Sequence, residues 1–168
     1  MDLEKLRPLP REFYARKTVK VAKELLGKYL VYKNKAWIIT ETEAYCGMKD
    51  KACHASWRKR ASCEHLWGRP GHLYVYLTYG IHYMLNIVTE KNNYPAAVLI
   101  RGVDKINGPG RLTKFLKINK SFDGMDITCG DFFIAGSGQK PKSIATPRIG
   151  VAYAGVWAKK LWRFVVKD

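Results

Sequence analysis

The chain has 168 residues, enough for one domain with a core of its own, and 47% of them are hydrophobic. Lysine and arginine number 30 against 14 aspartate and glutamate, so the formal net charge at pH 7 is +16. Self-repulsion of this size opposes compactness and indicates a polyanionic partner, while the lack of an apolar run near ~20 residues excludes a helical membrane span.

The first third of the chain predicts one helix and two strands. Thr18 is typical of a helix N-cap, the apolar residues of Val19 to Leu26 fall on one helical face, and Gly27 stands where helices stop. A short strand is expected over Lys28 to Tyr32. A longer strand is expected over Ala36 to Tyr45, because its residue types alternate.

The middle of the chain is rich in strand signals after an irregular stretch from Cys46 to Gly71. Leu73 to Thr78 and His82 to Thr89 predict a hairpin, and Ala96 to Val103 predicts a third strand of the same sheet. Gly108-Pro109-Gly110 then leads into a helix over Arg111 to Ile118. Short strands are predicted near residues 132–135, 148–152 and 162–166.

These elements indicate the α+β class. We expect a single domain over residues 1–168, built around a curved, mainly antiparallel sheet with a protruding hairpin and flanking helices. Strands dominate, and few helices separate them, so a doubly wound sheet fits less well.

The turn of the predicted hairpin holds Tyr79 beside Gly80, and glycine suits a tight turn because it accepts positive φ. A bulky ring near a protruding tip has two interpretations. It can fold back onto the sheet, or it can act as a wedge that enters the base stack of a nucleic acid. The pattern alone does not separate them.

Acidic and aromatic residues share one side of the strand predicted over Ala36 to Tyr45. Alternation puts Glu43 and Tyr45 on the same face, and His54 follows after a short irregular stretch. A carboxylate beside a tyrosine and a histidine can form a catalytic pocket or lie at a solvated strand edge. Arg101, at the end of an apolar strand, can likewise bind a phosphate or reach solvent.

The chain contains four cysteines, at Cys46, Cys53, Cys63 and Cys129. The first three lie near His54 and His65, so a metal site is one interpretation. Their spacing matches no zinc module, since no Cys-x-x-Cys pair is present, and we favour reduced thiols that pack as small hydrophobes. We therefore expect no metal site among these cysteines and histidines.

Six segments follow one another in a distinctive order along the chain. They are F-Y-A-R-K-T-V-K-V-A-K-E-L-L-G-K (13–28), E-T-E-A-Y-C-G-M-K-D-K-A-C-H-A (41–55), G-R-P-G-H-L-Y-V-Y-L-T-Y-G-I-H-Y-M-L-N-I-V-T (68–89), A-A-V-L-I-R (96–101), G-P-G-R-L-T-K (108–114) and P-R-I-G-V (147–151). In this order and spacing they resemble the alkyladenine (3-methylpurine) DNA glycosylase family, nearly from end to end.

The resemblance implies a monofunctional DNA glycosylase of base excision repair. Such an enzyme binds double-stranded DNA, flips a damaged purine out of the helix and hydrolyses its N-glycosidic bond without a cofactor, leaving an abasic site. The implied substrates are 3-methyladenine and 7-methylguanine, followed by hypoxanthine and ethenoadenine. We expect the protein to act on DNA as a monomer. Because no signal peptide is recognised, we expect it in the cytoplasm at the nucleoid, or in the nucleus if the source is eukaryotic.

The resemblance also implies roles for three catalytic groups. Glu43 matches the general base that deprotonates the attacking water. Arg101 matches the arginine beside that water and the backbone of the flipped nucleotide. The main-chain carbonyl of Ile149 matches a third anchor for the water.

Five further residues match groups that bind the DNA. Tyr45, His54 and Tyr76 match the aromatic walls that sandwich the extruded base. Asn86 matches the residue that collides with the exocyclic amino group of normal guanine. Tyr79 matches the residue that fills the gap left in the duplex, which favours the wedge interpretation.

One stretch departs from the family pattern. Residues 57–67 read W-R-K-R-A-S-C-E-H-L-W, where typical members carry a glycine- and arginine-rich loop. Changes beside His54 can alter which lesions fit.

Two other functions stay open: a catalytically silent DNA- or RNA-binding protein, and a nuclease, which would need metal ligands.

Overall fold

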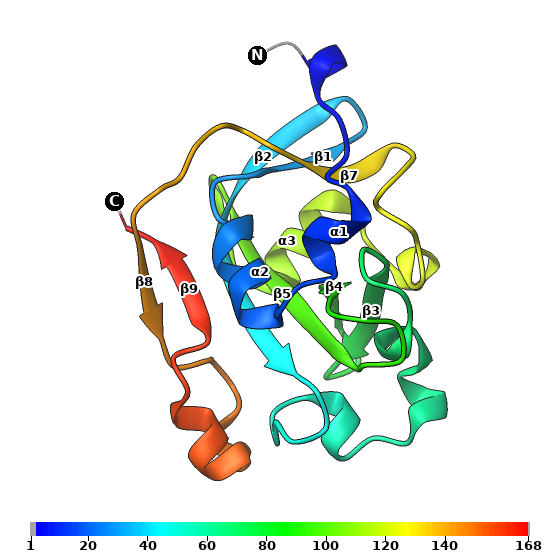
Figure 1. Ribbon diagram of the computed structural model, residues 1–168, viewed down its shortest axis with the longest axis vertical. Coiled ribbons are helices and arrows are strands. Elements are labelled where there is room, and N and C mark those ends of the chain that lie inside the picture. The colour runs from blue at the N-terminus through cyan, green and yellow to red at the C-terminus, as the bar shows by residue number, and fades with distance from the viewer. Residues whose placement is uncertain (1–2, 168) are drawn as a thin grey trace.

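The computed structural model describes residues 3–167 (Figure 1). Its helices are α1 (Arg11–Tyr14), α2 (Thr18–Leu25) and α3 (Pro109–Leu116), with short 3₁₀ segments η1 (Leu3–Lys5), η2 (His54–Ser56), η3 (Arg60–Ser62), η4 (Glu64–Trp67), η5 (Lys120–Phe122) and η6 (Ala152–Lys159). Its strands are β1 (Tyr29–Tyr32), β2 (Lys35–Cys46), β3 (Leu73–Thr78), β4 (His82–Val88), β5 (Ala96–Val103), β6 (Ile106–Asn107), β7 (Phe132–Ala135), β8 (Ser143–Thr146) and β9 (Arg163–Val166).

The strands form one nine-stranded sheet whose central order is β3-β4-β5-β2-β1-β7, and every pairing is antiparallel. The long strand β2 holds the sheet together. Its first part pairs with β1, and its second part pairs with β5 on one side, with register shifts on both sides of Glu41, and with β9 on the other. The sheet does not close into a barrel, and the predicted α+β class with a mainly antiparallel sheet is confirmed.

Helices α2 and α3 cover one face of the sheet with a single apolar core. Val21 and Leu25 of α2 and Leu112 of α3 are buried in the same cluster as Ile87 of β4 and Ile100 of β5. The amphipathic spacing seen in the sequence is the cause, since it puts one apolar stripe of each helix against the sheet. No helix within residues 3–167 is both long and apolar enough to cross a membrane.

The start of α2 differs from the prediction. Lys17 is the N-cap residue and makes no side-chain capping bond, whereas Thr18 is the first residue of the helix. The Thr18 hydroxyl donates instead to the carboxylate of Glu90 at 2.8 Å, a partner 72 positions away along the chain. The end of the helix is as predicted, because Gly27 adopts φ +80° just after the last turn.

The C-terminal region contains the second error. A strand was predicted over residues 148–152, but the strand of this region is β8, and Gly150 has φ +74°, which no extended strand allows. The buried side chain of Arg148 bonds to Asp50, and the backbone N–H of the exposed Ile149 donates to Glu43, so this segment bonds to acidic side chains rather than to a neighbouring strand. The hairpin of β3 and β4, strand β5 and strand β7 lie where they were predicted.

Candidate active site

The face of the sheet opposite α2 and α3 carries the predicted site residues. The strand register aligns Glu43 of β2 with Leu99 of β5, Leu99 with Asn86 of β4, and Asn86 with Tyr74 of β3. Directly paired residues project from the same face, so these four side chains form a row across four strands. Alternation along each strand adds Tyr45 and Tyr76 to this face.

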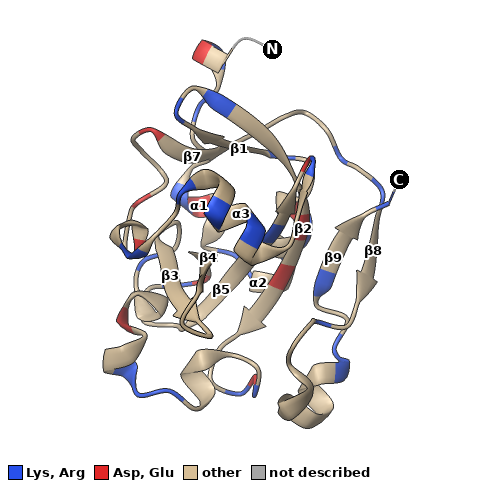
Figure 2. Cartoon of the chain, turned by 180° about the vertical axis from the view of Figure 1, so that it is seen from behind, with Lys and Arg blue, Asp and Glu red and all other residues tan. Residues whose placement is uncertain are grey.

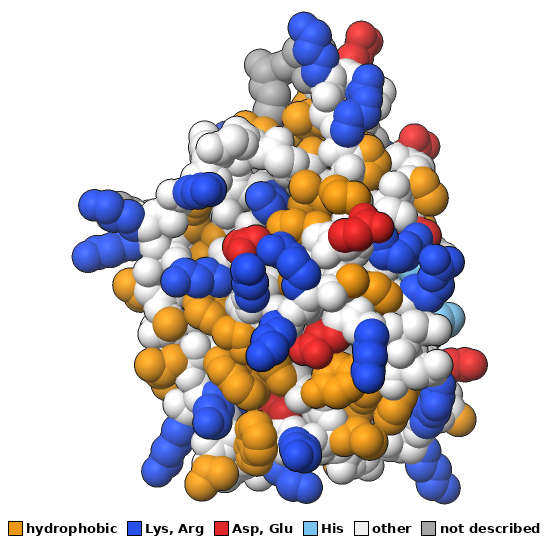
Figure 3. Space-filling model, in the orientation of Figure 1, with side chains coloured by type: hydrophobic (Ala, Val, Ile, Leu, Met, Phe, Trp, Pro, Cys, Tyr) orange, Lys and Arg blue, Asp and Glu red, His pale blue; other side chains and the backbone are white. Residues whose placement is uncertain are grey.

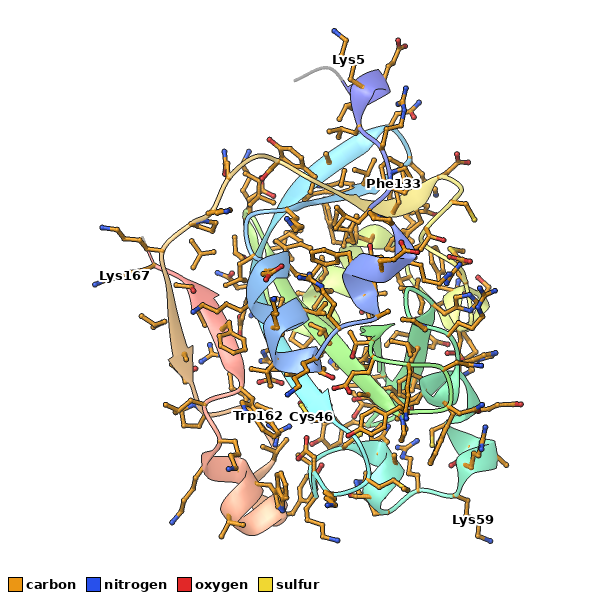
Figure 4. The ribbon with its side chains drawn as sticks, viewed as in Figure 1. Lys5, Cys46, Lys59, Phe133, Trp162 and Lys167 are labelled. Atoms are coloured by element: carbon orange, nitrogen blue, oxygen red, sulfur yellow. The ribbon has the colours of Figure 1, made fainter. Side chains whose placement is uncertain are left out.

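A cavity of about 420 Å³ opens over this row, between the sheet, η2 and the segment before η6. Seven of the eight predicted site residues line it: Tyr45, His54, Tyr76, Tyr79, Asn86, Arg101 and Ile149. The end of β2 and the start of β9, marked in Figure 4 by Cys46 and Trp162, lie side by side near it, where the Ala44 N–H donates to the Trp162 carbonyl at 2.8 Å. Segments far apart in the sequence therefore meet at one cavity.

The eighth residue, Glu43, lies just behind the lining and is 0% exposed. Its Oε2 accepts the hydroxyl of Tyr45 at 2.7 Å, and its Oε1 accepts the backbone N–H of Ile149 at 2.8 Å. Burial raises the pKa of Glu43, and the nearby Arg101 charge and these two hydrogen bonds oppose the rise. The carboxylate is thus held rigidly and has a greater affinity for a proton than an exposed glutamate.

Arg101 joins the two glutamates of β2. Its Nε donates to Oε1 of Glu41 at 2.7 Å, and its Nη1 lies 3.5 Å from Oε2 of Glu43. Arg163 of β9 bonds to the same Glu41 oxygen at 2.6 Å. Arg101 and Arg163 therefore balance the charges of the two glutamates. The Arg101 side chain also lines the cavity.

Ile149 takes part through a different atom from the one expected. The structure shows its N–H bound to Glu43, which orients the carboxylate. The predicted role of its carbonyl, as an anchor for water, stays a prediction.

His54, Tyr74 and Tyr76 form one continuous aromatic wall of the cavity. The ring centroids of His54 and Tyr76 are 4.3 Å apart, so no base fits between these two rings. The predicted sandwich would need the space between them and Tyr45, which also lines the cavity, and it stays a prediction. His54 Nδ1 shares a hydrogen bond of 2.7 Å with the hydroxyl of Tyr74. Burial, and then the charge of Arg58, lower the pKa of His54 from 6.5 to about 4, so the imidazole is neutral at pH 7.

The remaining two predicted residues are Asn86, at the floor of the cavity, and Tyr79, at its rim. Asn86 is 4% exposed, and its Nδ2 donates to the carbonyls of Tyr74 and Met84 at 3.2 and 3.4 Å. Tyr79 is 88% exposed at the hairpin tip, with φ +50°. The ring does not fold back onto the sheet, so the first of the two interpretations for Tyr79 is wrong for this structure.

Three residues of the site were missed by the sequence reasoning. Tyr74 was recognisable, because the alternation in β3 puts it on the same face as Tyr76. Asp50 and Arg148 both lie in segments that match the family, but no local signal indicated that they pair. They form a wholly buried ion pair of 2.6 Å, and the guanidinium lies 4.9 Å from the ring centroid of Tyr45. This pair supports the cavity wall from behind.

The cysteines are free thiols. Cys53 and Cys63 are buried and pack with Leu66 and Tyr74 under the aromatic wall. Burial raises the pKa of Cys53 to about 12, so the thiol stays protonated at neutral pH. Within residues 3–167, histidine, cysteine, aspartate and glutamate form no group of three or more suited to a metal ion.

The outer surface is strongly basic. Figure 2 shows lysine and arginine along most connections of the chain, whereas the acidic residues of β2 lie within the sheet. In Figure 3 hydrophobic side chains gather in the lower half of the face, where Figure 1 places η2 and η6, and basic side chains surround them. Such a surface fits a polyanion that also presents apolar groups.

Comparison with known proteins gives a consistent result. The family model described as methylpurine-DNA glycosylase (MPG) matches residues 12–107 and 102–168. A protein of Rickettsia rickettsii (strain Sheila Smith) is 47% identical over 174 residues, covering 99% of this chain and 93% of its own, and is named "Putative 3-methyladenine DNA glycosylase". Proteins of Rickettsia felis (46% identical; 99% and 97% covered) and Legionella pneumophila (strain Corby; 44% identical; 97% and 96% covered) carry the same name.

The match extends over nearly the whole chain and includes every segment that contributes to the cavity. These relatives, all bacterial, are also covered over nearly their whole length. The chain therefore belongs to the methylpurine-DNA glycosylase family.

Proposed function

We propose that this protein is a monofunctional glycosylase that flips alkylated purines out of double-stranded DNA and hydrolyses their N-glycosidic bond. The observation that carries the proposal is the buried carboxylate of Glu43, held by two hydrogen bonds behind a cavity with aromatic walls. The substrates proposed first are 3-methyladenine and 7-methylguanine. The product is DNA with an abasic site.

The cavity and the hairpin suit a flipped purine. Extrusion costs a few kcal/mol of stacking and pairing, and damage lowers that cost. The exposed ring of Tyr79 would fill the gap left behind, while the base enters between Tyr45 and the wall of His54 and Tyr76. Asn86, at the cavity floor, would clash with the amino group of normal guanine.

The chemistry needs one base and one water. Oε1 of Glu43 accepts only the N–H of Ile149 among the described residues, which leaves a second lone pair for a water proton. The water oxygen bonds to the sugar C1′, its proton passes to Glu43, and the electrons of the C1′–N9 bond leave with the purine. The transition state resembles the oxocarbenium ion of glycoside hydrolysis.

The charge of the base decides how readily it leaves. A purine alkylated at N3 or N7 is cationic and becomes neutral as it departs, so no acid is required. Hypoxanthine and ethenoadenine are neutral in DNA and have to gain a proton as they leave, so we rank them below the alkylated purines as substrates.

Release of free base from methylated duplex DNA, measured in EDTA, tests this function. Wild type should release base and leave abasic sites without strand breaks. Glu43→Gln should lose a factor of about 10²–10⁴ in rate, the usual contribution of a general base. Glu12→Gln, which changes an exposed glutamate of α1, is the matched control and should retain the wild-type rate.

Other outcomes would overturn the proposal. Salt-sensitive DNA binding by wild type without any base release would favour the silent binding protein. Strand breaks by pure protein would show a lyase or nuclease activity. Full activity in Glu43→Gln would remove Glu43 from catalysis.

A further inference from the structure

Two arginines line the cavity, Arg101 and Arg58, and a third, Arg148, lies buried behind the ring of Tyr45. Two of these three have acidic partners. Arg101 is bonded to Glu41, and Arg148 is paired with Asp50 at 2.6 Å. The charge of each is therefore compensated next to the site. The remaining one is Arg58, which comes from the stretch that departs from the family pattern.

Arg58 lies against aromatic rings instead. Its guanidinium carbon is 5.0 Å from the ring centroid of Trp57 and 5.7 Å from that of Tyr76, and the side chain is half-buried in the cavity lining. In the part of the chain that the structure describes, no carboxylate lies within 4.0 Å of it. A cation already interacts with the ring that would stack on the substrate.

The neighbouring basic residues point elsewhere. Lys59 projects away from the molecule in Figure 4. Arg60 lies over the ring of Trp67 at 4.7 Å and donates to Asn93 at 2.8 Å, and it is not part of the cavity lining. Of this basic run, Arg58 alone is aimed at the cavity.

We propose that Arg58 determines lesion specificity: its uncompensated charge disfavours purines that are cationic in DNA and favours neutral purines. Two unit charges a few ångströms apart in a half-buried site repel each other, and the repulsion weakens binding of a cationic purine but not of a neutral one. The guanidinium also offers N–H donors to an oxo group or ring nitrogen of a neutral purine. This inference rests on the proposed glycosylase function.

Single-turnover base release from two duplexes tests it, one containing a single 7-methylguanine and the other a single hypoxanthine. The quantity measured is the ratio of the two rates at subsaturating enzyme, where each rate includes binding of the purine, and the intrinsic reactivity of each base cancels between variants. Arg58→Gln should raise the 7-methylguanine to hypoxanthine ratio by about tenfold, because it removes one unit charge near the bound base. Arg58→Lys keeps the charge and should leave the ratio near the wild-type value.

Arg60→Gln is the matched control, since it removes the same charge from the same loop outside the cavity. Its ratio should equal that of wild type. The proposal is overturned if Arg58→Gln slows both substrates equally, as loss of a phosphate contact would do, or if Arg60→Gln shifts the ratio as much. If wild type releases neither purine, the proposed function fails instead, and the two failures are thereby distinguished.

Discussion

Replacement of Asp50 by asparagine is the most direct test of what supports the site. The carboxylate is wholly buried and accepts four hydrogen bonds, from both terminal nitrogens of Arg148 at 2.6 and 2.9 Å and from the N–H groups of Cys46 and Ala52 at 3.0 and 3.1 Å. Asparagine has nearly the same volume, but it removes the charge and turns one acceptor into a donor. Arg148 is then left buried without a counter-charge.

The expected loss in the free energy of unfolding is large for a domain of this size. Removing one partner of a buried ion pair destabilises a protein by about 3–5 kcal/mol, against a total stability of about 5–15 kcal/mol. With a urea m-value of about 2 kcal/mol/M, a loss of 4 kcal/mol lowers the unfolding midpoint by about 2 M. Asp131→Asn changes an exposed aspartate and should stay within about 0.5 kcal/mol of wild type.

Urea unfolding followed by circular dichroism gives the measurement. In the double variant Asp50→Asn/Arg148→Met, no uncompensated charge remains, so the double variant should be less destabilised than the sum of the two single changes. A loss below about 1 kcal/mol in Asp50→Asn, or strict additivity in the double variant, would refute the reasoning.

Three further predictions concern the cavity. Because Glu43 has to be ionised and burial raises its pKa, base release by wild type should fall on acidification with a midpoint above the ordinary 4.5, and a midpoint at or below 4.5 would contradict the assignment. Tyr79→Ala should weaken binding to lesion-containing duplex more than to undamaged duplex, as measured by titration; equal weakening would remove its role as a wedge. Asn86→Ser should increase release of normal guanine relative to 7-methylguanine, and unchanged discrimination would exclude Asn86 from selectivity.

The predictable part of the fold is the part set by local pattern. The hairpin of β3 and β4 and the strand β5 lie where alternation and the turn at Gly80 put them, because each depends on neighbours in the sequence. The errors at Thr18 and at residues 148–152 have the opposite origin. Thr18 bonds to Glu90 and Arg148 to Asp50, and partners 72 and 98 positions away give no signal in a local window.

The site, like the fold, has features that local pattern predicts and features that depend on residues distant in the sequence. That Glu43 and Tyr45 share a face follows from alternation within β2, and the structure shows them hydrogen-bonded. Their juxtaposition with His54, Asn86 and Arg101 depends on strand register, which periodicity does not specify. The family resemblance supplied it, whereas the Asp50–Arg148 pair was visible only in three dimensions.

The distribution of charge links the fold to the function. Acidic groups inside the molecule compensate arginines: Glu41 and Glu43 balance Arg101 and Arg163, and Asp50 balances Arg148. These internal groups contain as many positive as negative charges, so the excess of 16 positive charges is carried by the other residues, mainly at the surface. A polyanion is attracted to that surface, while the same internal pairs hold Glu43 and Tyr45 in position. Arg58 differs from these internal arginines, because its charge faces the cavity without a carboxylate in contact among the described residues. General attraction to DNA acts on both lesions alike. A change in the 7-methylguanine to hypoxanthine ratio on replacing Arg58 by glutamine would therefore report selection of the lesion alone.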